Sequence, residues 1–518
     1  MDIQIAIRDL AAYAYRTGLV PEEDLFFLLN SLSALFGLFE VSFRPEDVMH
    51  KASTISKTDI ETGQELEALL LFMEGRLKKE FPLPSYTKEK DFASRIMAYL
   101  TPPPSELLRI FKEKYALSPL SATDWFYDFC QNCNYIRRYQ TARNIHWSSF
   151  TSYGDLLLTL DASSDPILFR PEEYSAYTEH AYPTCIFCRE NIGYSGHSSY
   201  PSGRNRRSVS LLLREKSYDF QYLPGAAASE LFVLSSAKHE KTGSDLESIL
   251  RLLDFTRQFP HYFAGLDAEL PFAKAASCEH GHFLGGRFVT PLAKAESDRS
   301  FSVKGYPDIH CSLVKWPASV IRLQGEDPQK LAKLADELQK SWQAYSDESL
   351  PLLAETEGKK HHSISIIARR RDSLFELDLI LRSNLCDRER PEGIFYPRRQ
   401  YQHFIYRGIG ILELSGLMIF PWQLKLDLEQ IEEALLEKRS LASSAELRRH
   451  VDWAKDIRRD HKTLTKDNIS SVLKKEIGMA FLHMLEDSAV FKRTAAGQAA
   501  FDRFILSMEA LFTTQERF

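Results

Sequence analysis

The sequence predicts an α+β protein in which helical N- and C-terminal regions flank two successive blocks of mixed helices and strands. Three observations support this fold class. Apolar residues recur every three or four positions over about the first 115 residues, and again from residue 426 to 518, as in amphipathic helices. Between these regions, short apolar runs alternate with helical stretches. The two mixed blocks follow one another in the chain, which suggests a duplicated core.

The N-terminal region is expected to contain several helices. One helical pattern begins at Leu25 and continues to Phe36, and another covers residues 66–73. Three prolines at 102–104 interrupt the pattern, after which Leu107 and Phe111 resume it. Near Gly154 the pattern changes to short apolar runs such as 156–160.

The central part of the chain is expected to supply the sheet. The spacing predicts helices over 245–259 and 327–345, and a hairpin formed by 363–367 and 374–381. Further strands are expected at 209–213, 231–234, 301–303 and 410–418.

Composition excludes several classes of protein. The 518 residues are enough for two to four domains, and 44% hydrophobic with 26% charged residues is an ordinary globular mixture. A net charge of −6 argues against a nucleic-acid partner, which would require a broad basic surface. The N-terminus reads as an amphipathic helix rather than a signal peptide, and no apolar stretch reaches the roughly 18 residues of a membrane span. We therefore expect a cytoplasmic protein with no membrane partner.

The cysteines favour a metal site. The chain has seven, including two Cys-x-x-Cys pairs, and an odd, clustered set favours metal binding or free thiols over disulfides. Cys185 and Cys188, combined with His239 and His280, would give two thiolates and two imidazoles, a tetrahedral set suited to Zn²⁺. The alternative is a redox pair or an accidental spacing. The other pair, Cys130 and Cys133, is expected to be packing or free thiols.

The motif His280-Gly281-His282 is the strongest candidate for catalysis. On an extended segment the two imidazoles point to the same face, so one can anchor the site while the other attacks phosphorus. Neutral imidazole is nucleophilic near pH 7 and leaves readily again. Gly285-Gly286-Arg287 follows at once, and glycines admit a ligand while arginine binds phosphate. The alternative is a surface pair that arose by chance.

Two basic runs are candidate phosphate sites. They contain Arg204 to Arg207 and Arg369 to Arg371, and arginines can bind phosphate oxygens with paired N–H donors. Each run could equally be a solvated face. The first follows the Cys185 pair closely, which favours a functional role for it.

Several segments together resemble the class II UDP-glucose–hexose-1-phosphate uridylyltransferases, the galactose-1-phosphate uridylyltransferase family. The resemblance extends over residues 1–518. Its clearest segments are YPTCIFCREN (182–191), QFPHYF (258–263), HGHFLGGR (280–287), VKWPASVIRLQ (314–324) and IARRR (367–371), with WFYDF (125–129) and NYIR (134–137) towards the N-terminus.

The resemblance implies a fold of two histidine-triad-like halves with mixed or antiparallel sheets. It implies a helical region at 1–170, a first half at 171–345 and a second half with a helical C-terminus at 346–518. It also implies transfer of UMP from UDP-glucose to a hexose 1-phosphate, namely galactose 1-phosphate, through a uridylyl group on His282. A structural Zn²⁺ on the four cysteine and histidine ligands, no organic cofactor and a homodimer complete the expectation.

The resemblance also assigns candidate substrate-binding positions, some of which depart from the family. Leu284 stands where the family has glutamine, Asp267 where it has asparagine, and Tyr396-Pro397-Arg398 where it has His-Pro-His. Ser229-Glu230-Leu231 replaces Asn-Glu-His. The alternatives are therefore a diverged enzyme for another sugar phosphate or nucleotide, a weakly catalytic nucleotide-sugar-binding protein, or a zinc protein without a nucleotide site. The candidate substrate-binding residues are Asn205, Arg207, Asp267, Ser277, Leu284, Gly285, Gly286, Arg287, Arg369 and Arg370.

Overall fold

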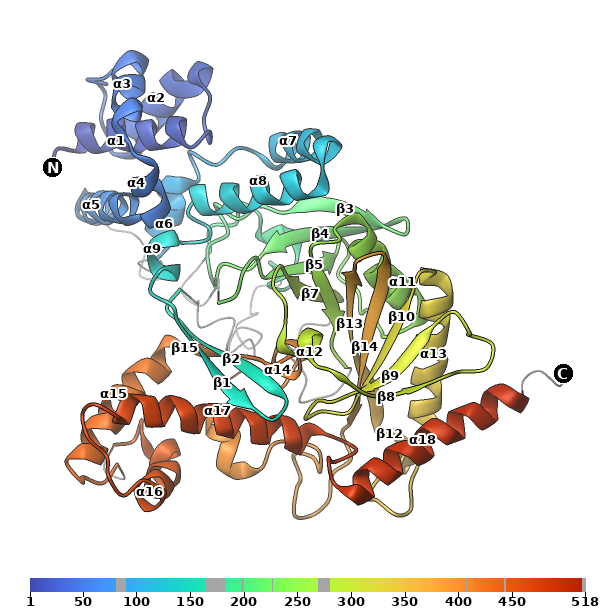
Figure 1. Cartoon of the computed structure of the whole chain (residues 1–518). Coiled ribbons are helices and arrows are strands. Elements are labelled where there is room, and N and C mark those ends of the chain that lie inside the picture. The colour runs from blue at the N-terminus through green and yellow to red at the C-terminus, as the bar shows by residue number, and fades with distance from the viewer. Residues whose placement is uncertain are drawn as a thin grey trace.

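The computed structural model describes most of the chain and confirms the α+β class (Figure 1). The described residues are 1–80, 90–163, 182–196, 200–225, 227–268, 280–406, 408–441 and 444–514. Helices lie at both ends of the chain, and a large sheet occupies the middle.

The N-terminal region is helical, as predicted. Its first helix begins after Asp2, whose side chain accepts a hydrogen bond from the Gln4 amide, and it buries one face through Ile7 and Leu10. The three prolines end the preceding segment and place Pro104 at the first position of α7. The helices are α1 (Ile3–Arg16), α2 (Leu25–Leu35), α3 (Pro45–Thr54), α4 (Lys57–Thr62), α5 (Gln64–Glu80), α6 (Lys90–Met97), α7 (Pro104–Leu117), α8 (Pro119–Asn132) and α9 (Arg138–Thr141).

The large sheet has ten strands within the described residues, and all of its pairings are antiparallel. Its order is β3-β4-β5-β7-β6-β13-β14-β10-β9-β8. The strands are β3 (Val209–Leu213), β4 (Lys216–Tyr222), β5 (Phe232–Ser236), β6 (Phe263–Leu266), β7 (His282–Gly286), β8 (Ser297–Phe301), β9 (His310–Val314), β10 (Val320–Gly325), β13 (His362–Arg371) and β14 (Leu374–Ser383). A two-stranded ribbon, β11 (Glu355–Thr356) and β12 (Lys359–Lys360), stands apart from it.

The sheet consists of two repeats with the same topology. In each repeat three antiparallel strands are followed by a helix and two more strands, and the fifth strand lies between the third and the fourth. The helices are α11 (Leu246–Gln258) and α13 (Pro328–Ala344). The fourth strands, β6 and β13, pair with each other and join the repeats, with Gly265 opposite Ile367. This topology supports the predicted duplication of the core.

Along the chain, the first repeat ends with β7 and the second begins with β8. The predicted boundary at 345/346 therefore lies inside the second repeat, between α13 and β13. The division of the chain into three domains remains a prediction.

Each face of the large sheet packs against different elements. Helices α11 and α13 cover one face, where Phe283 of β7 joins the core (Figure 1). On the opposite face, Val233 and Ile380 pack with Leu158 of a small second sheet. Because side chains alternate along a strand, His282 and Leu284 point to this second face. The small sheet is β1 (Ile145–Thr151), β2 (Gly154–Asp161) and β15 (Leu417–Pro421).

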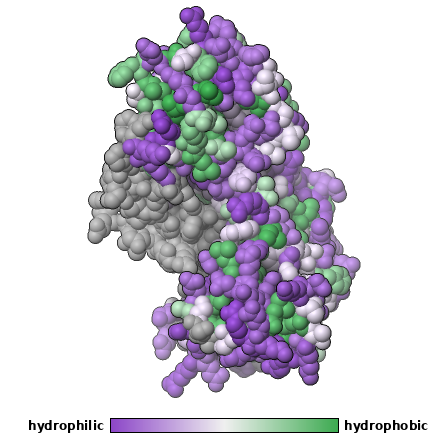
Figure 2. Space-filling model, turned by 90° about the vertical axis from the view of Figure 1, so that its left-hand side faces the viewer, coloured by the Kyte–Doolittle hydropathy of each residue, from purple (hydrophilic) through white to green (hydrophobic). Residues whose placement is uncertain are grey.

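The C-terminal region is largely helical, as predicted, and follows the small sheet. Helices α15 and α17 pack against that sheet. The face formed by the N-terminal helices above and by α15 and α16 below is mostly hydrophilic, with small separate hydrophobic groups (Figure 2). The remaining helices are α12 (Pro291–Lys294), α14 (Ile411–Leu414), α15 (Trp422–Leu436), α16 (Val451–Asp460), α17 (Ile469–Ser488) and α18 (Ala495–Thr514). None of the described helices has the length and apolar character needed to cross a membrane.

Two predicted strands need correction. The strand expected at 301–303 is displaced: β8 covers Ser297–Phe301, so it ends at the residue where the predicted strand begins. The strand expected at 410–418 is mostly the short helix α14, and β15 begins only at Leu417. The carboxylate of Glu413 accepts a hydrogen bond from the Gly410 amide at 2.9 Å, and this cap favours a helical turn over an extended strand.

Candidate active site and metal site

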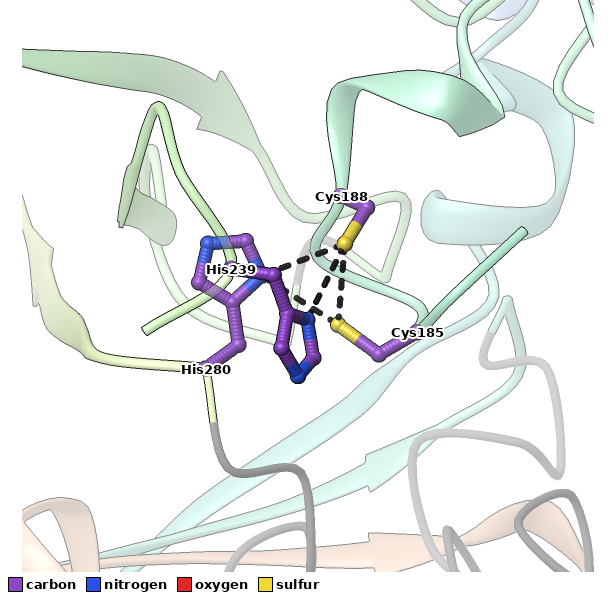
Figure 3. A group of neighbouring side chains, drawn as sticks. All are labelled: Cys185, Cys188, His239 and His280. Atoms are coloured by element: carbon purple, nitrogen blue, oxygen red, sulfur yellow. Dashed lines mark hydrogen bonds between the residues drawn. The ribbon is translucent and has the colours of Figure 1, made fainter. Parts of the chain in front are cut away.

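Four predicted metal ligands meet in one cluster. Cys185 and Cys188 precede a short 3₁₀ turn, His239 follows β5, and His280 precedes β7 (Figure 3). The two sulfur atoms are 3.5 Å apart. The Nδ1 atom of His280 lies 3.2 Å from the Cys185 sulfur, and that of His239 lies 3.3 Å from the Cys188 sulfur. The sequence prediction that these four side chains converge is confirmed.

The cluster has the size of a tetrahedral metal site. Bonds of about 2.3 Å to sulfur and 2.0–2.1 Å to nitrogen place tetrahedral zinc ligands roughly 3.3–3.8 Å apart. All four ligand atoms lie within 4.8 Å of one another. The Nε2 atom of His280 lies 2.7 Å from the Ser236 carbonyl oxygen, so Nε2 carries the proton and Nδ1 turns its lone pair towards the sulfurs. The residues present therefore fit a divalent metal ion with soft and borderline ligands.

His282 begins β7 with one ring nitrogen already fixed. Its Nδ1 lies 2.9 Å from the carbonyl oxygen of His280, to which it donates its proton. Nε2 then carries the lone pair, and among the described residues no hydrogen bond occupies it. The ring packs on Phe187, with centroids 4.5 Å apart. Burial lowers the pKa of His282, which keeps the ring neutral and nucleophilic near pH 7.

The glycines around His282 allow close packing. A Cβ atom on Gly281 would lie 1.7 Å from the Thr242 hydroxyl oxygen, so the position between the two histidines admits only glycine. A Cβ on Gly285 would lie 2.2 Å from the Phe263 carbonyl oxygen. On Gly286 it would lie 2.8 Å from the Phe288 ring. In the described structure these glycines therefore bring β7 close to its neighbours, and their role in ligand binding remains a prediction.

Leu284 lies on the same face as His282. It pairs with Val233 of β5 and Gly265 of β6. The side chain is half-buried and packs against the core between the two sheets. This position therefore presents hydrocarbon, with no hydrogen-bond donor, two residues after the candidate nucleophile.

Arg287 already binds two carboxylates. Its guanidinium contacts Asp124 of α8 and lies 3.0 Å from Glu230. Glu230 in turn accepts a hydrogen bond from the Tyr262 hydroxyl. These contacts tie α8 to the end of β7, and a phosphate contact by Arg287 remains a prediction.

Asn205 and Arg207 are buried and bind backbone groups. The Asn205 amide donates to the Cys133 carbonyl at 2.9 Å. Arg207 donates to the carbonyl oxygens of Pro102 at 2.8 Å and Thr101 at 3.1 Å. It also donates to those of Arg204 and Arg206. The contacts observed for this basic run therefore join it to the N-terminal helices.

Arg369 belongs to a buried ion cluster in the second repeat. It donates to Glu376 at 2.6 Å and also contacts Asp378. Asp378 also accepts a hydrogen bond from a second arginine, Arg322 of β10, at 2.7 Å. Arg370 lies outside this cluster: it is half-buried, donates to the Ser373 carbonyl at 2.6 Å and stacks on Phe375.

Two carboxylates of the ion cluster lie on β14, the strand of the second repeat that corresponds to β7 in the first. Leu284 pairs with Gly265, Asp378 pairs with Ile367, and Gly265 and Ile367 pair with each other across the junction of the repeats. Leu284 and Asp378 therefore lie on the same face of the sheet, as do His282 and Glu376, which lie two residues earlier on their strands. The described residues thus place the candidate nucleophile in the first repeat and paired charges in the second.

Asp267 lies near a charge that sequence reasoning missed. The buried guanidinium of Arg382, on β14, is electrostatically coupled to the Asp267 carboxylate. A signal was present: polar residues alternate with apolar ones along β14 at Glu376, Asp378 and Arg382, which marks a polar stripe on one face. The last candidate, Ser277, lies outside the described residues.

Comparisons with known proteins match most of the chain to one family. The galactose-1-phosphate uridyl transferase N-terminal domain matches residues 74–290, and the C-terminal domain of the same family matches 255–453. Galactose-1-phosphate uridylyltransferase of Halalkalibacterium halodurans is 36% identical over 98% of this chain and 99% of its own. The protein of the same name from Clostridium acetobutylicum is 34% identical over 96% and 98%. Yeast Ap4A phosphorylase Apa2 matches with a TM-score of 0.31 at 11% identity, over 66% of this chain and 97% of that one, a similarity too low to support an argument.

Proposed function

Because the chain belongs to the galactose-1-phosphate uridylyltransferase family, we propose that it is a cytoplasmic enzyme of galactose metabolism that exchanges UMP between UDP-glucose and galactose 1-phosphate. The observation that carries the proposal is the tautomer of His282. Its Nδ1–H donates a hydrogen bond to the His280 carbonyl oxygen, with 2.9 Å between Nδ1 and the oxygen, which leaves Nε2 as the nucleophile.

The reaction has two half-reactions that balance. In the first, Nε2 of His282 attacks the α-phosphorus of UDP-glucose, and the bond from that phosphorus to the bridging oxygen breaks. Glucose 1-phosphate leaves with the oxygen and its electron pair. In the second, a phosphate oxygen of galactose 1-phosphate attacks the same phosphorus, the N–P bond breaks, and UDP-galactose leaves. Nδ1 keeps its proton throughout, hydrogen-bonded to His280.

The cysteine and histidine cluster supports the site structurally. Cys185, Cys188, His239 and His280 would hold a Zn²⁺ ion, whose contribution is to fix the loops before β7. An ion bound by all four side chains would have no position left for substrate. These residues would then serve to stabilise the backbone that carries His282.

One observation favours a second candidate function. Leu284 offers no donor to a phosphoryl oxygen on the same face as His282. A chain that binds nucleotide sugars but transfers UMP slowly, or that serves another sugar phosphate or nucleotide, would fit this position.

Product analysis tests the proposed function. The protein is incubated with UDP-glucose and ¹³C-labelled galactose 1-phosphate, beside a His282→Asn variant. We expect labelled UDP-galactose and free glucose 1-phosphate from the wild type, and neither from the variant. Absence of labelled product, with UDP-glucose still bound, would support the second candidate instead. The proposed homodimer is tested separately by light scattering of the purified chain.

A further inference from the structure

Asp267 and His282 lie at the same end of two neighbouring strands: Asp267 directly follows β6, and His282 begins β7. Gly265 of β6 pairs with Leu284 of β7. Asp267 follows Gly265 by two residues, and His282 precedes Leu284 by two on the antiparallel neighbour. Because side chains two apart share a face, both residues belong to the face that carries the candidate active site.

Arg382 lies near the end of β14 in the second repeat and approaches the same end of the neighbouring strands. It alternates with Asp378 along β14 and so lies on this face of the sheet. Only 1% of it is exposed. One guanidinium nitrogen donates to the Ile409 carbonyl at 3.1 Å. A Cβ atom on the next residue, Gly410, would lie 2.7 Å from the Asp267 carboxylate. The guanidinium and the carboxylate therefore approach two adjacent residues, Ile409 and Gly410.

The ionisable groups coupled to Arg382 are all acidic. Glu413 is also electrostatically coupled to it, and so is the Tyr396 hydroxyl. Burial lowers the pKa of Arg382 to about 10, against the opposing effect of Asp267 and Glu413, so the guanidinium is charged at neutral pH. The Glu413 carboxylate is bound to the Gly410 amide and caps α14. Arg382 is thus the cation that faces Asp267.

We infer that Arg382 is a positioning residue of the active site, which offsets the charge of Asp267 beside His282 so that a nucleotide phosphate can approach. This inference rests on the proposed function and deepens it. An uncompensated carboxylate so close to the candidate nucleophile would repel the phosphates of UDP-glucose. The glycine at 410 completes the arrangement, because a side chain there would push the Asp267 carboxylate out of place.

Ligand binding separates this role from a structural one. Arg382→Met, Asp267→Asn and the double variant are compared with wild type for affinity towards UMP and towards uridine, which lacks the phosphate. We expect Arg382→Met to weaken UMP binding by at least about tenfold while uridine binding stays within about twofold. The double variant should recover most of the loss, since neither charge remains.

A matched control is Arg322→Met, which removes another buried arginine of the same sheet face from its carboxylate partner Asp378. It should lower thermal stability without changing the ratio of UMP to uridine affinity. Equal losses for UMP and uridine in Arg382→Met, or a double variant no better than the single one, would overturn the inference. Because binding is measured, the test holds even where no UMP is transferred, and a failure of the proposed function is seen separately.

Discussion

The ring of His282 and the backbone of His280 are joined by a hydrogen bond of 2.9 Å, from Nδ1–H to the carbonyl oxygen. The ring of the same His280 lies in the cysteine cluster, 3.2 Å from the Cys185 sulfur. One residue therefore contributes its side chain to the metal site and its carbonyl to the nucleophile. A change in the metal site is expected to reach His282 through this residue.

Loss of one of the four candidate metal ligands should lower both the metal content and the thermal stability of the protein. We expect Cys188→Ser to retain less than about a tenth of the wild-type metal and to melt at a lower temperature, because the remaining groups cannot complete a tetrahedral site. Elemental analysis and thermal unfolding measure the two effects. Cys386→Ser, at an exposed cysteine, is the control and should match the wild type. A Cys188→Ser protein with full metal content would contradict the assignment.

Leu284→Gln should speed UMP transfer. Glutamine at this position adds a donor on the face of His282, and one donor aimed at developing charge is worth about 100- to 1,000-fold in rate. The measurement is the rate of glucose 1-phosphate release from UDP-glucose. Leu284→Met changes the shape without adding a donor and should leave the rate unchanged. If both variants behave as wild type, the apolar residue is not what limits the rate.

Glu376→Gln should destabilise the second repeat by about 3–5 kcal/mol, because the clustered arginines lose one of their two buried carboxylates and only Asp378 remains. Urea unfolding at neutral pH measures the effect. Arg370→Ala, at the half-buried neighbour outside the ion cluster, removes a stacking contact with Phe375 and should change stability by less than about 1 kcal/mol. Equal stability of Glu376→Gln and wild type would rule out a stabilising ion cluster.

The stabilisation by Glu376 should depend on pH. Burial raises the pKa of Glu376, but a hydrogen bond from Arg371 and the charges of Arg369 and Arg322 outweigh it and hold the pKa at about 2, against 4.5 without these contacts. The folded pKa is depressed, so this stabilisation is complete above pH 4.5 and is lost as the pH falls towards 2. The stability difference between wild type and Glu376→Gln should therefore shrink over that range. A difference that stays constant would contradict this pKa.

Gly285→Ala should destabilise the first repeat, by about 1–3 kcal/mol, because its Cβ would meet the Phe263 backbone and the Phe232 ring. Gly75→Ala is the matched control. It lies in α5 with open space around it, and should stabilise the chain by about 0.5–1 kcal/mol. Thermal unfolding of both variants checks the contrast. A neutral Gly285→Ala would mean that β7 can shift without cost.

Local signals in the sequence predicted much of the fold. Asp245 and Asp327 mark the starts of α11 and α13, and in the structure each caps its helix by accepting a backbone N–H. The hairpin of β13 and β14 was also predicted. The pairing of β6 with β13 was not, because it depends on residues about 100 positions apart rather than on local spacing.

The site was predicted unevenly for the same reason. The residue types alone suggest the cysteine and histidine cluster, whereas the choice of His282 rather than His280 comes from the family resemblance. The coupling of Asp267 to Arg382 does not, because it requires the two repeats to be joined in a particular register. The strand 410–418 was mistaken because the cap formed by Glu413 on Gly410 outweighs the apolar run.

The most direct test of covalent UMP transfer is the mass of the intact protein after incubation with UDP-glucose alone. We predict a gain of one UMP on the wild type, absent from His282→Ala and removed again by galactose 1-phosphate. A wild-type protein that binds UDP-glucose but gains no mass, or a His282→Ala variant that gains the same mass, would contradict transfer through His282.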